Sequence, residues 1–63
     1  MTNLKALREQ AGLTQAEAAR LVFRTRVSWA AYESGRVEAD AAVVELFKRR
    51  AALMIEARRK EGL

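Results

Sequence analysis

The stretch LTQAEAARLVFRTRVSWAAYESGR, residues 13–36, carries the strongest local signals for structure in this 63-residue chain. Thr14 and Glu17 have the spacing of a capping box, in which each side chain accepts a hydrogen bond from an otherwise unpaired amide of the first helical turn. The pattern therefore predicts a helix that begins at about Gln15. Its buried face is predicted to consist of small and aliphatic residues, namely Ala18, Ala19, Leu21 and Val22.

A second short helix is predicted after a turn near Phe23 and Arg24. Thr25 is a favourable N-terminal cap for this helix, and Gly35 suits the left-handed residue that commonly ends a helix. Two short helices joined by a tight turn form a helix-turn-helix, here at about residues 14–35. The second helix of such a motif is the candidate reader of DNA.

The same stretch resembles the helix-turn-helix of the Cro/CI-type (XRE-like, lambda-repressor-like) transcriptional regulators, whose small members are typical of phages and plasmids. The positions that match the family pattern are Leu13, Thr14, Gln15, Leu21, Tyr32, Glu33, Ser34 and Gly35. The match contains no gap. The resemblance implies a compact, all-α, lambda-repressor-like domain built around a central helix-turn-helix.

The turn of the motif departs from the family pattern, which usually has glycine at the position of Phe23 and an apolar residue at the position of Arg24. A phenylalanine is costly at a positive φ angle. Either the turn has a different geometry, or the first helix of the motif runs further and Phe23 supplies the missing apolar plug. We expect the second arrangement.

The composition favours one small domain that spans residues 1–63. Hydrophobic residues make up 51% of the chain, many of them alanine, and there is no proline, which together predict an all-helical domain of close-packed short helices. The family resemblance implies four to five of them. The chain has no cysteine and so no disulfide to stabilise it. Because a domain of this size buries a limited fraction of its surface, we expect a partner subunit or a ligand to contribute to stability.

The absence of histidine and cysteine removes the commonest metal ligands and most nucleophiles and acid–base groups. We therefore expect no enzymatic activity, no metal or other cofactor and no small-molecule substrate. The lack of a long apolar run and of a basic-then-apolar N-terminus predicts a cytoplasmic protein with no membrane partner. The net charge of +4 favours a polyanionic partner, although it would suit DNA, RNA or an anionic membrane surface equally.

Ahead of the motif, a first helix is predicted with Thr2 or Asn3 as its cap and Gly12 at its end. In this helix Arg8 occupies the place of a family arginine that reaches the glutamate matched here by Glu33. The resemblance thus implies a structural salt bridge between the two. The alternative is that both are solvated surface charges that contribute little to stability.

The resemblance also implies which residues contact DNA. The base-reading positions of the family correspond to Arg26, Val27, Ala30 and Ala31. Arg26 alone among these has a long, donor-rich side chain suited to a guanine edge, whereas Val27 and the alanines would touch thymine methyl groups. Trp29 and Tyr32 are expected to face the core.

Contacts to the DNA backbone are predicted at Thr14, Gln15, Arg24, Thr25, Ser28 and Arg36. Amides at a helix start form a natural phosphate site, to which the Gln15 side chain would add a hydrogen bond. The alternative for this site is a capping box that serves only the helix. Arg24 could reach a base instead, because it lies in the turn that departs from the family pattern.

After a cap at Asp40, a helix is predicted over residues 41–60, because this segment has no glycine, proline, serine or threonine to stop it. The alternative is a break near residues 49–51, which would give the fifth short helix common in the family. Residues 43–47 suffice to cover the core. The apolar residues then left without cover are Ala51, Leu53, Met54 and Ile55, which we expect to form a dimer interface.

The leading functional hypothesis is a sequence-specific, double-stranded DNA-binding regulator. We expect a homodimeric repressor that reads an inverted-repeat operator through the major groove and occludes a promoter. The alternative is a helical protein-interaction module, or an antitoxin-like partner, that binds another protein through the C-terminal apolar stripe. The slim and basic outer face predicted for the reading helix favours the regulator.

Overall fold

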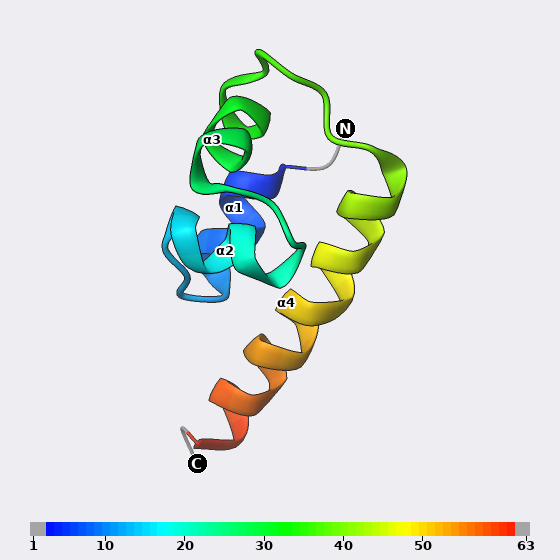
Figure 1. Ribbon diagram of the computed structural model, residues 1–63. Helices are drawn as coiled ribbons and strands as arrows, with labels where there is room; N and C mark the ends of the chain where they lie inside the picture. The colour runs from blue at the N-terminus through cyan, green and yellow to red at the C-terminus, as the bar shows by residue number, and fades with distance from the viewer. Residues whose placement is uncertain (1–2, 62–63) are drawn as a thin grey trace.

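Four helices make up the described part of the chain, residues 3–61, in the computed structural model (Figure 1). They are α1 (Leu4–Gln10), α2 (Gln15–Leu21), α3 (Arg26–Ser34) and α4 (Ala41–Glu61). No strand occurs among these residues. The predicted all-α fold is confirmed, and α2 and α3 form its central helix-turn-helix.

The predicted capping box is present at the start of α2. Thr14 Oγ1 accepts a hydrogen bond from Glu17 N at 3.1 Å, and Glu17 Oε1 accepts one from Thr14 N at 2.9 Å. The same hydrogen bonds lower the pKa of Glu17 below its usual value. Asn3 caps α1, since its Oδ1 accepts a hydrogen bond from Ala6 N at 3.0 Å. Thr2, the alternative cap, lies outside the described residues.

Helix α3 begins and ends where the sequence predicts. Thr25 Oγ1 accepts a hydrogen bond from Ser28 N at 3.1 Å at its start. Gly35 follows its last residue with a φ of 80°, the left-handed conformation expected of a C-terminal glycine.

The turn between α2 and α3 differs from the expected arrangement. Helix α2 ends at Leu21, and Phe23 has a φ of 58° and a side chain that is 73% exposed. The expectation of a longer helix with Phe23 as an apolar plug is therefore wrong. Contacts with α4 offset part of the cost of the positive φ: the Arg50 guanidinium lies 5.2 Å from the centroid of the Phe23 ring, and Arg50 Nη1 donates to Leu21 O at 2.9 Å.

The core is centred on Trp29, Phe47 and Val22, which are fully buried. The Trp29 and Phe47 rings are 4.5 Å apart between centroids, which joins α3 directly to α4. Ala18 and Ala19 on α2 are also buried, and their small side chains allow α3 to approach closely. The predicted inward orientation of Trp29 is confirmed.

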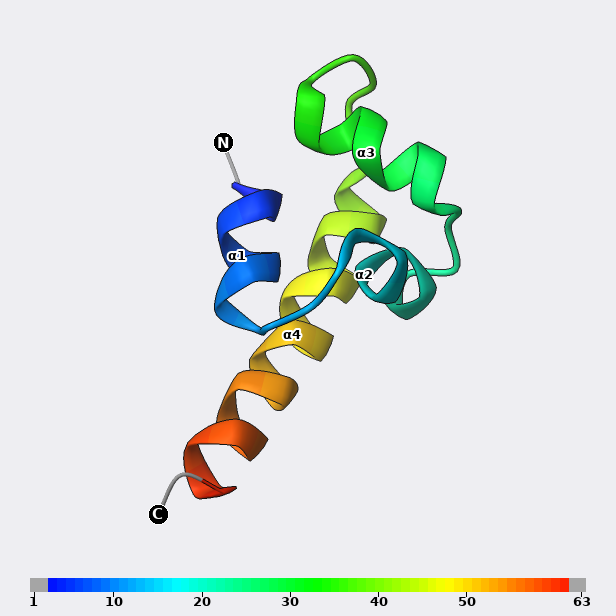
Figure 2. The same ribbon diagram turned by 90° about the vertical axis from the view of Figure 1, so that its left-hand side faces the viewer.

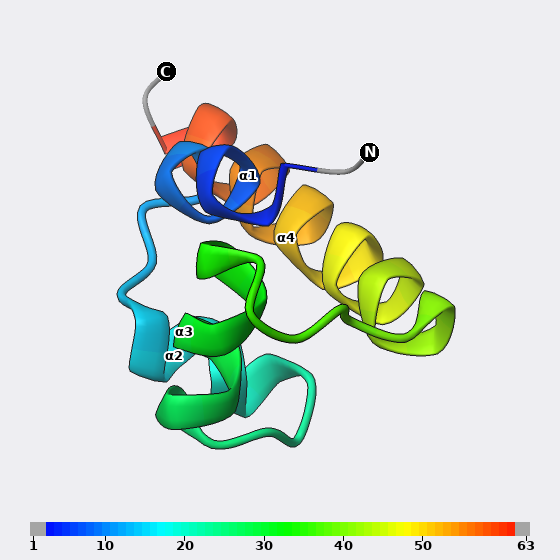
Figure 3. The ribbon, with the colours of Figure 1, turned by 90° about the horizontal axis from the view of Figure 1, so that it is seen from above.

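Helix α4 runs without a break through the residues where an interruption was considered, so the long-helix prediction is confirmed. It packs against both α1 and α2, and its last turns extend beyond the other helices (Figures 1 and 2). The molecule is accordingly elongated, with extents of 39 × 19 × 19 Å. Seen from above, α1 lies over the distal half of α4 (Figure 3), where Arg58 Nη1 donates to Ala11 O at 3.1 Å.

The predicted dimerisation stripe is divided by the packing of α4. Ala51 is fully buried in the core, one turn after Phe47, and its assignment to a dimer interface is therefore wrong. Met54 and Ile55 are partly buried against the same core, because α1 covers more of α4 than the sequence indicated. Leu53 alone of the four remains open, with 71% of its side chain exposed.

Candidate nucleic-acid interface

Glu33, near the end of α3, ties this helix to α1. Arg8 Nε donates to Glu33 Oε2 at 2.6 Å and Arg8 Nη2 donates to Glu33 Oε1 at 3.2 Å, so the ion pair implied by the family resemblance is present and bidentate. The side chains of Arg8 and Glu33 are only 13% and 6% exposed. Arg8 Nη1 also donates to Leu13 O at 2.9 Å, which fixes the segment before α2.

Two further donors reach the same carboxylate. Gln15 Nε2 donates to Glu33 Oε1 at 3.1 Å, and the Trp29 indole Nε1 donates to Glu33 Oε2. Burial acts to raise the pKa of Glu33, but the hydrogen bonds from Arg8, Gln15 and Trp29 outweigh it and lower the pKa below its usual value. We define Arg8, Gln15, Trp29 and Glu33 as the Glu33 cluster.

The contacts of Gln15 and Trp29 with Glu33 were not predicted from the sequence. The spacing of Trp29 and Glu33, four residues apart on one helix, was a usable signal for the indole contact. Nothing in the sequence indicates the Gln15 contact, since it depends on how α2 meets α3. Its consequence is that the Gln15 side chain is held in place at the start of α2, half-buried, rather than free in solvent.

The outer edge of α3 carries the side chains that remain available for reading bases. Arg26 is exposed, Val27 is 62% exposed and Ala30 is half-buried. Ala31 is only 5% exposed, so its assignment to the open base-reading surface is wrong. The segment after α3 is bound to the backbone of this residue, since Arg36 N and Val37 N both donate to Ala31 O, at 3.1 and 3.3 Å.

The residues predicted to contact the DNA backbone lie at the start of α2, at the start of α3 and, in the case of Arg36, just after the end of α3. Thr25, Arg24 and Arg36 are exposed, and Ser28 is half-buried. Thr25 also donates to Ser28 Oγ at 3.1 Å, and Arg24 Nη2 lies 3.7 Å from Asp40 Oδ2 in a solvent-exposed ion pair. Thr14, exposed at the start of α2, uses its hydroxyl as the helix cap.

Comparison with protein families supports the same motif. The model of a family described as a helix-turn-helix domain matches residues 2–60. The chain belongs to this family. It is a member of the XRE/Cro-like group of helix-turn-helix domains, as the resemblance in residues 13–35 implied. Comparison with curated proteins and with solved structures gave no match.

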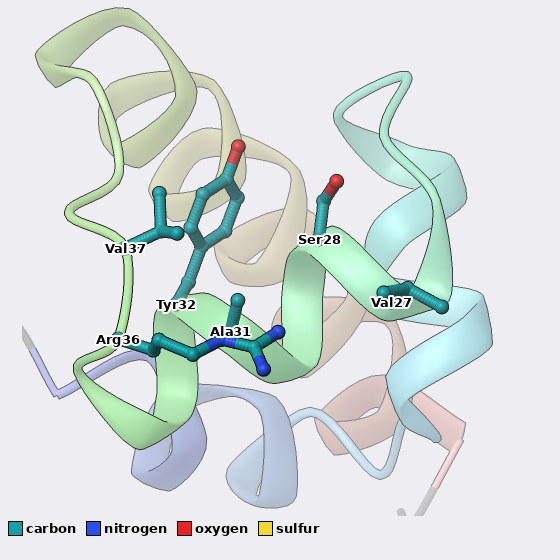
Figure 4. A pocket seen from close by; sticks show the side chains of 6 residues that line it. All are labelled: Val27, Ser28, Ala31, Tyr32, Arg36 and Val37. Carbon is teal, nitrogen blue, oxygen red and sulfur yellow. The ribbon is translucent and has the colours of Figure 1, made fainter.

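Membership identifies DNA as the class of partner for this helix-turn-helix domain. The reading helix of the motif is then α3, which enters the DNA groove in such domains. A further feature of this helix is a concavity of about 210 Å³ on its outer side (Figure 4). Its lining consists of Val27, Ser28, Ala31, Tyr32, Arg36 and Val37.

Within residues 3–61, no helix is both long enough and apolar enough to cross a bilayer. In the same part of the chain, no three acidic side chains come together in a way that could hold a metal ion.

Proposed function

We propose that the chain is a sequence-specific transcriptional regulator that binds double-stranded DNA by placing α3 in the major groove. The observation that carries the proposal is the slim outer edge of α3, where Arg26 projects beside the smaller Val27 and Ala30. An α-helix with modest side chains is about 10–12 Å wide, close to the width of the major groove. Small residues on this edge therefore let the helix approach the base edges closely.

The Glu33 cluster supports this role because it holds α3 rigidly on α1 and α2. A reading helix gains specificity only when its side chains are presented in a fixed register to the DNA. Trp29 helps to fix α3 in two ways, since its ring fills the core and its indole N–H donates to Glu33. We propose that Gln15, held by the same carboxylate, offers its second amide hydrogen to a phosphate.

With α3 in the major groove, few of its side chains could form hydrogen bonds with base edges. Arg26 is the side chain suited to a bidentate contact with guanine, and we assign it the main hydrogen-bonded base contact. We assign the exposed Arg24, Thr25 and Arg36, with Ser28 and Thr14, to the DNA backbone. With phosphate contacts in the majority and a net charge of +4, affinity is expected to fall steeply as salt increases.

We further propose that the regulator is a homodimeric repressor that acts in the cytoplasm and needs no enzymatic step. Two copies of α3 related by a two-fold axis would enter successive major grooves about 34 Å apart and require an inverted repeat. Leu53 supports an interface on α4, because a leucine this exposed on a helix gains by burial against a second copy. Occupancy of a promoter is the simplest way for a DNA-binding domain to repress transcription.

A footprint on DNA selected from a random pool, or on the DNA upstream of its own gene, tests the proposal. We expect a protected inverted repeat at moderate salt. Arg26→Ala should weaken binding to that site by about 1–3 kcal/mol and relax the preference at one base pair. Arg59→Ala, which removes the same charge from the distal part of α4, is the matched control. No selected sequence and no protected repeat would refute the regulator.

Two variants separate the remaining assignments. Gln15→Ala should weaken binding to all DNA sequences nearly alike, so a loss confined to the specific site would contradict a phosphate role. Leu53→Glu should give monomers in light scattering after size exclusion, because it places a charge in the proposed interface. An unchanged dimer would move the interface elsewhere. The protein-interaction module would be favoured instead if the chain does not bind DNA but captures a different protein, and if Leu53→Glu abolishes that capture.

A further inference from the structure

Phe23 is the most open of the large apolar side chains that are exposed in residues 3–61. Its ring is 73% exposed, and its φ of 58° is a conformation that suits glycine. A left-handed backbone costs a residue with a Cβ atom at least as much as a cation–π contact at an exposed site returns. The contact of the ring with Arg50 therefore does not by itself account for a phenylalanine in this turn.

The position of Phe23 indicates that another molecule covers the ring. Residues that break a local structural rule without a gain in stability are concentrated at functional sites. An aromatic ring removes a large apolar area from water when a partner buries it, and aromatic side chains are the commonest anchors of protein interfaces. The gain that the fold does not provide would then come from binding.

Cationic side chains accompany the ring. The guanidinium carbon of Arg50 lies 5.2 Å from the centroid of the Phe23 ring, and Arg50 Nη1 donates to Leu21 O at 2.9 Å, which holds the guanidinium in place. Arg20 is exposed in the last turn of α2, three residues before Phe23. We define Arg20, Phe23 and Arg50 as the turn surface.

The two arginines of the turn surface are available to an acidic partner. Within residues 3–61, neither Arg20 nor Arg50 forms an ion pair, whereas Arg24 lies 3.7 Å from Asp40. A guanidinium carries several N–H donors, so the bond from Arg50 to a backbone carbonyl leaves others to bind a carboxylate. A partner that brings carboxylates would therefore meet cations that the fold has not neutralised.

The combination of ring and cations limits the class of partner. Arginine binds both phosphates and carboxylates, but the ring needs an apolar group to cover it, and the DNA backbone presents phosphates without apolar side chains. We propose that the turn surface binds an acidic segment of another protein, which places an aliphatic or aromatic side chain on Phe23 and carboxylates on Arg20 and Arg50. None of these three residues is assigned to DNA, so such a partner would leave the outer edge of α3 open.

A library of random peptides displayed on phage and selected on the wild-type chain tests the proposal. We expect enrichment of peptides that carry acidic residues next to an aliphatic or aromatic side chain. Binding of a selected peptide, measured by fluorescence anisotropy, should weaken as salt increases, because its carboxylate contacts lie at the surface. Selection of peptides without this pattern, or of none, would overturn the inference.

Three variants connect the binding of a selected peptide to the turn surface. Phe23→Gly removes the ring and relaxes the backbone, so it should fold like wild type while it weakens peptide binding by about 30-fold, as expected for an aromatic anchor. Arg20→Ala should weaken binding by up to about fivefold. Leu53→Ala is the matched control, because it removes a similarly exposed apolar side chain from α4, and it should bind like wild type. A peptide that binds Phe23→Gly as tightly as wild type would contradict the proposal.

The same Phe23→Gly variant distinguishes the other possible occupants. We expect it to keep the molecular mass in light scattering and the DNA affinity of the wild-type chain. A smaller mass would mean that a second copy covers the ring, and a loss of DNA affinity would mean that DNA does, and either result would overturn the acidic protein partner. A wild-type chain that selects acidic peptides but no DNA sequence would refute the regulator and leave the turn surface intact.

Discussion

Replacing Glu33 with glutamine removes one charge from the point where three helices meet. The carboxylate accepts two hydrogen bonds from Arg8 and one each from Gln15 and Trp29, and its side chain is 6% exposed. A glutamine of the same shape must turn an amide hydrogen towards these donors. Hydrogen bonds to charged groups are worth about 1.5–3 kcal/mol, and breaking a buried ion pair from one side costs about 3–5 kcal/mol. We expect Glu33→Gln to destabilise the fold by about 3 kcal/mol.

That loss is large for a chain of this size, whose total stability should be about 3–9 kcal/mol. Urea unfolding followed by far-UV circular dichroism should show a midpoint lower by about 2–3 M. Glu56→Gln is the matched control, because Glu56 lies 3.7 Å from Arg59 in an exposed pair that should contribute less than about 1 kcal/mol. Equal midpoints for the two variants would refute the structural importance assigned to the Glu33 cluster.

The pH dependence gives the same prediction an independent test. Because the pKa of Glu33 is lower in the folded chain than its ordinary value, its contribution is fully present above the ordinary pKa. The contribution is lost as the pH falls through the folded value. The stability gap between wild type and Glu33→Gln should therefore be constant near neutral pH and narrow in acid. A gap that stays constant down to about pH 3 would contradict the mechanism.

Two comparisons of backbone substitutions test how α4 supports the other helices. Phe23→Gly removes the strain of a positive φ, worth about 1 kcal/mol, and should leave the stability near or above that of wild type. Phe23→Ala keeps the strain and loses the Arg50 contact, so it should be about 1 kcal/mol less stable than wild type in urea unfolding. Gly12→Ala should cost about 1 kcal/mol more than Gly35→Ala in thermal unfolding. Both glycines have positive φ, but only at Gly12 would a Cβ meet Arg58 Nη1, at 1.6 Å. Equal losses of stability in Gly12→Ala and Gly35→Ala would contradict the role assigned to Arg58. A Phe23→Gly variant that is as unstable as Phe23→Ala would contradict the strain assigned to Phe23.

Sequence patterns predicted the elements that depend on local contacts. Thr14 with Glu17, and Thr25 with Gly35, specify the ends of α2 and α3 through hydrogen bonds and φ angles within a few residues. The continuity of α4 follows from the absence of any helix-breaking residue in residues 41–60. The family resemblance supplied the pairing of Arg8 with Glu33, which lies beyond the reach of local patterns.

The errors arose where contacts outside the regular repeat of one helix decide the outcome. Phe23 adopts a left-handed conformation at the end of α2, where Arg24 N donates to Ala19 O at 2.9 Å, and Arg50 of α4 lies over its ring and donates to Leu21 O. Ala31 has the helical phase of a reading residue, but it is only 5% exposed and lies in the concavity that the Arg36–Val37 segment helps to line. Helical periodicity gives the direction in which a side chain points from its own helix. It does not show which neighbouring segments pack beside that side chain. Contacts of these kinds need coordinates.

Ala51 was wrongly included in the dimer stripe for a related reason, since the packing of α4 places it in the core. Arg50 and Arg58 of α4 bind the carbonyls of Leu21 and Ala11, at the C-terminal ends of α2 and α1. These helix ends carry partial negative charge, so each guanidinium is favourably placed. The two contacts fix the rotation of α4 about its axis, which turns Ala51 into the core and Leu53 outwards.

A second copy that packs on Leu53 can therefore dock on α4 without rotating it or disturbing the Glu33 cluster. Dimerisation would then raise affinity by presenting two unchanged reading helices to one operator, an effect of effective concentration. It follows that Leu53→Glu should keep the fold of the wild-type chain and the base preference of a single half-site. Its DNA affinity should no longer depend on the spacing between the half-sites. A monomeric variant with an altered base preference would instead mean that the partner reshapes α3.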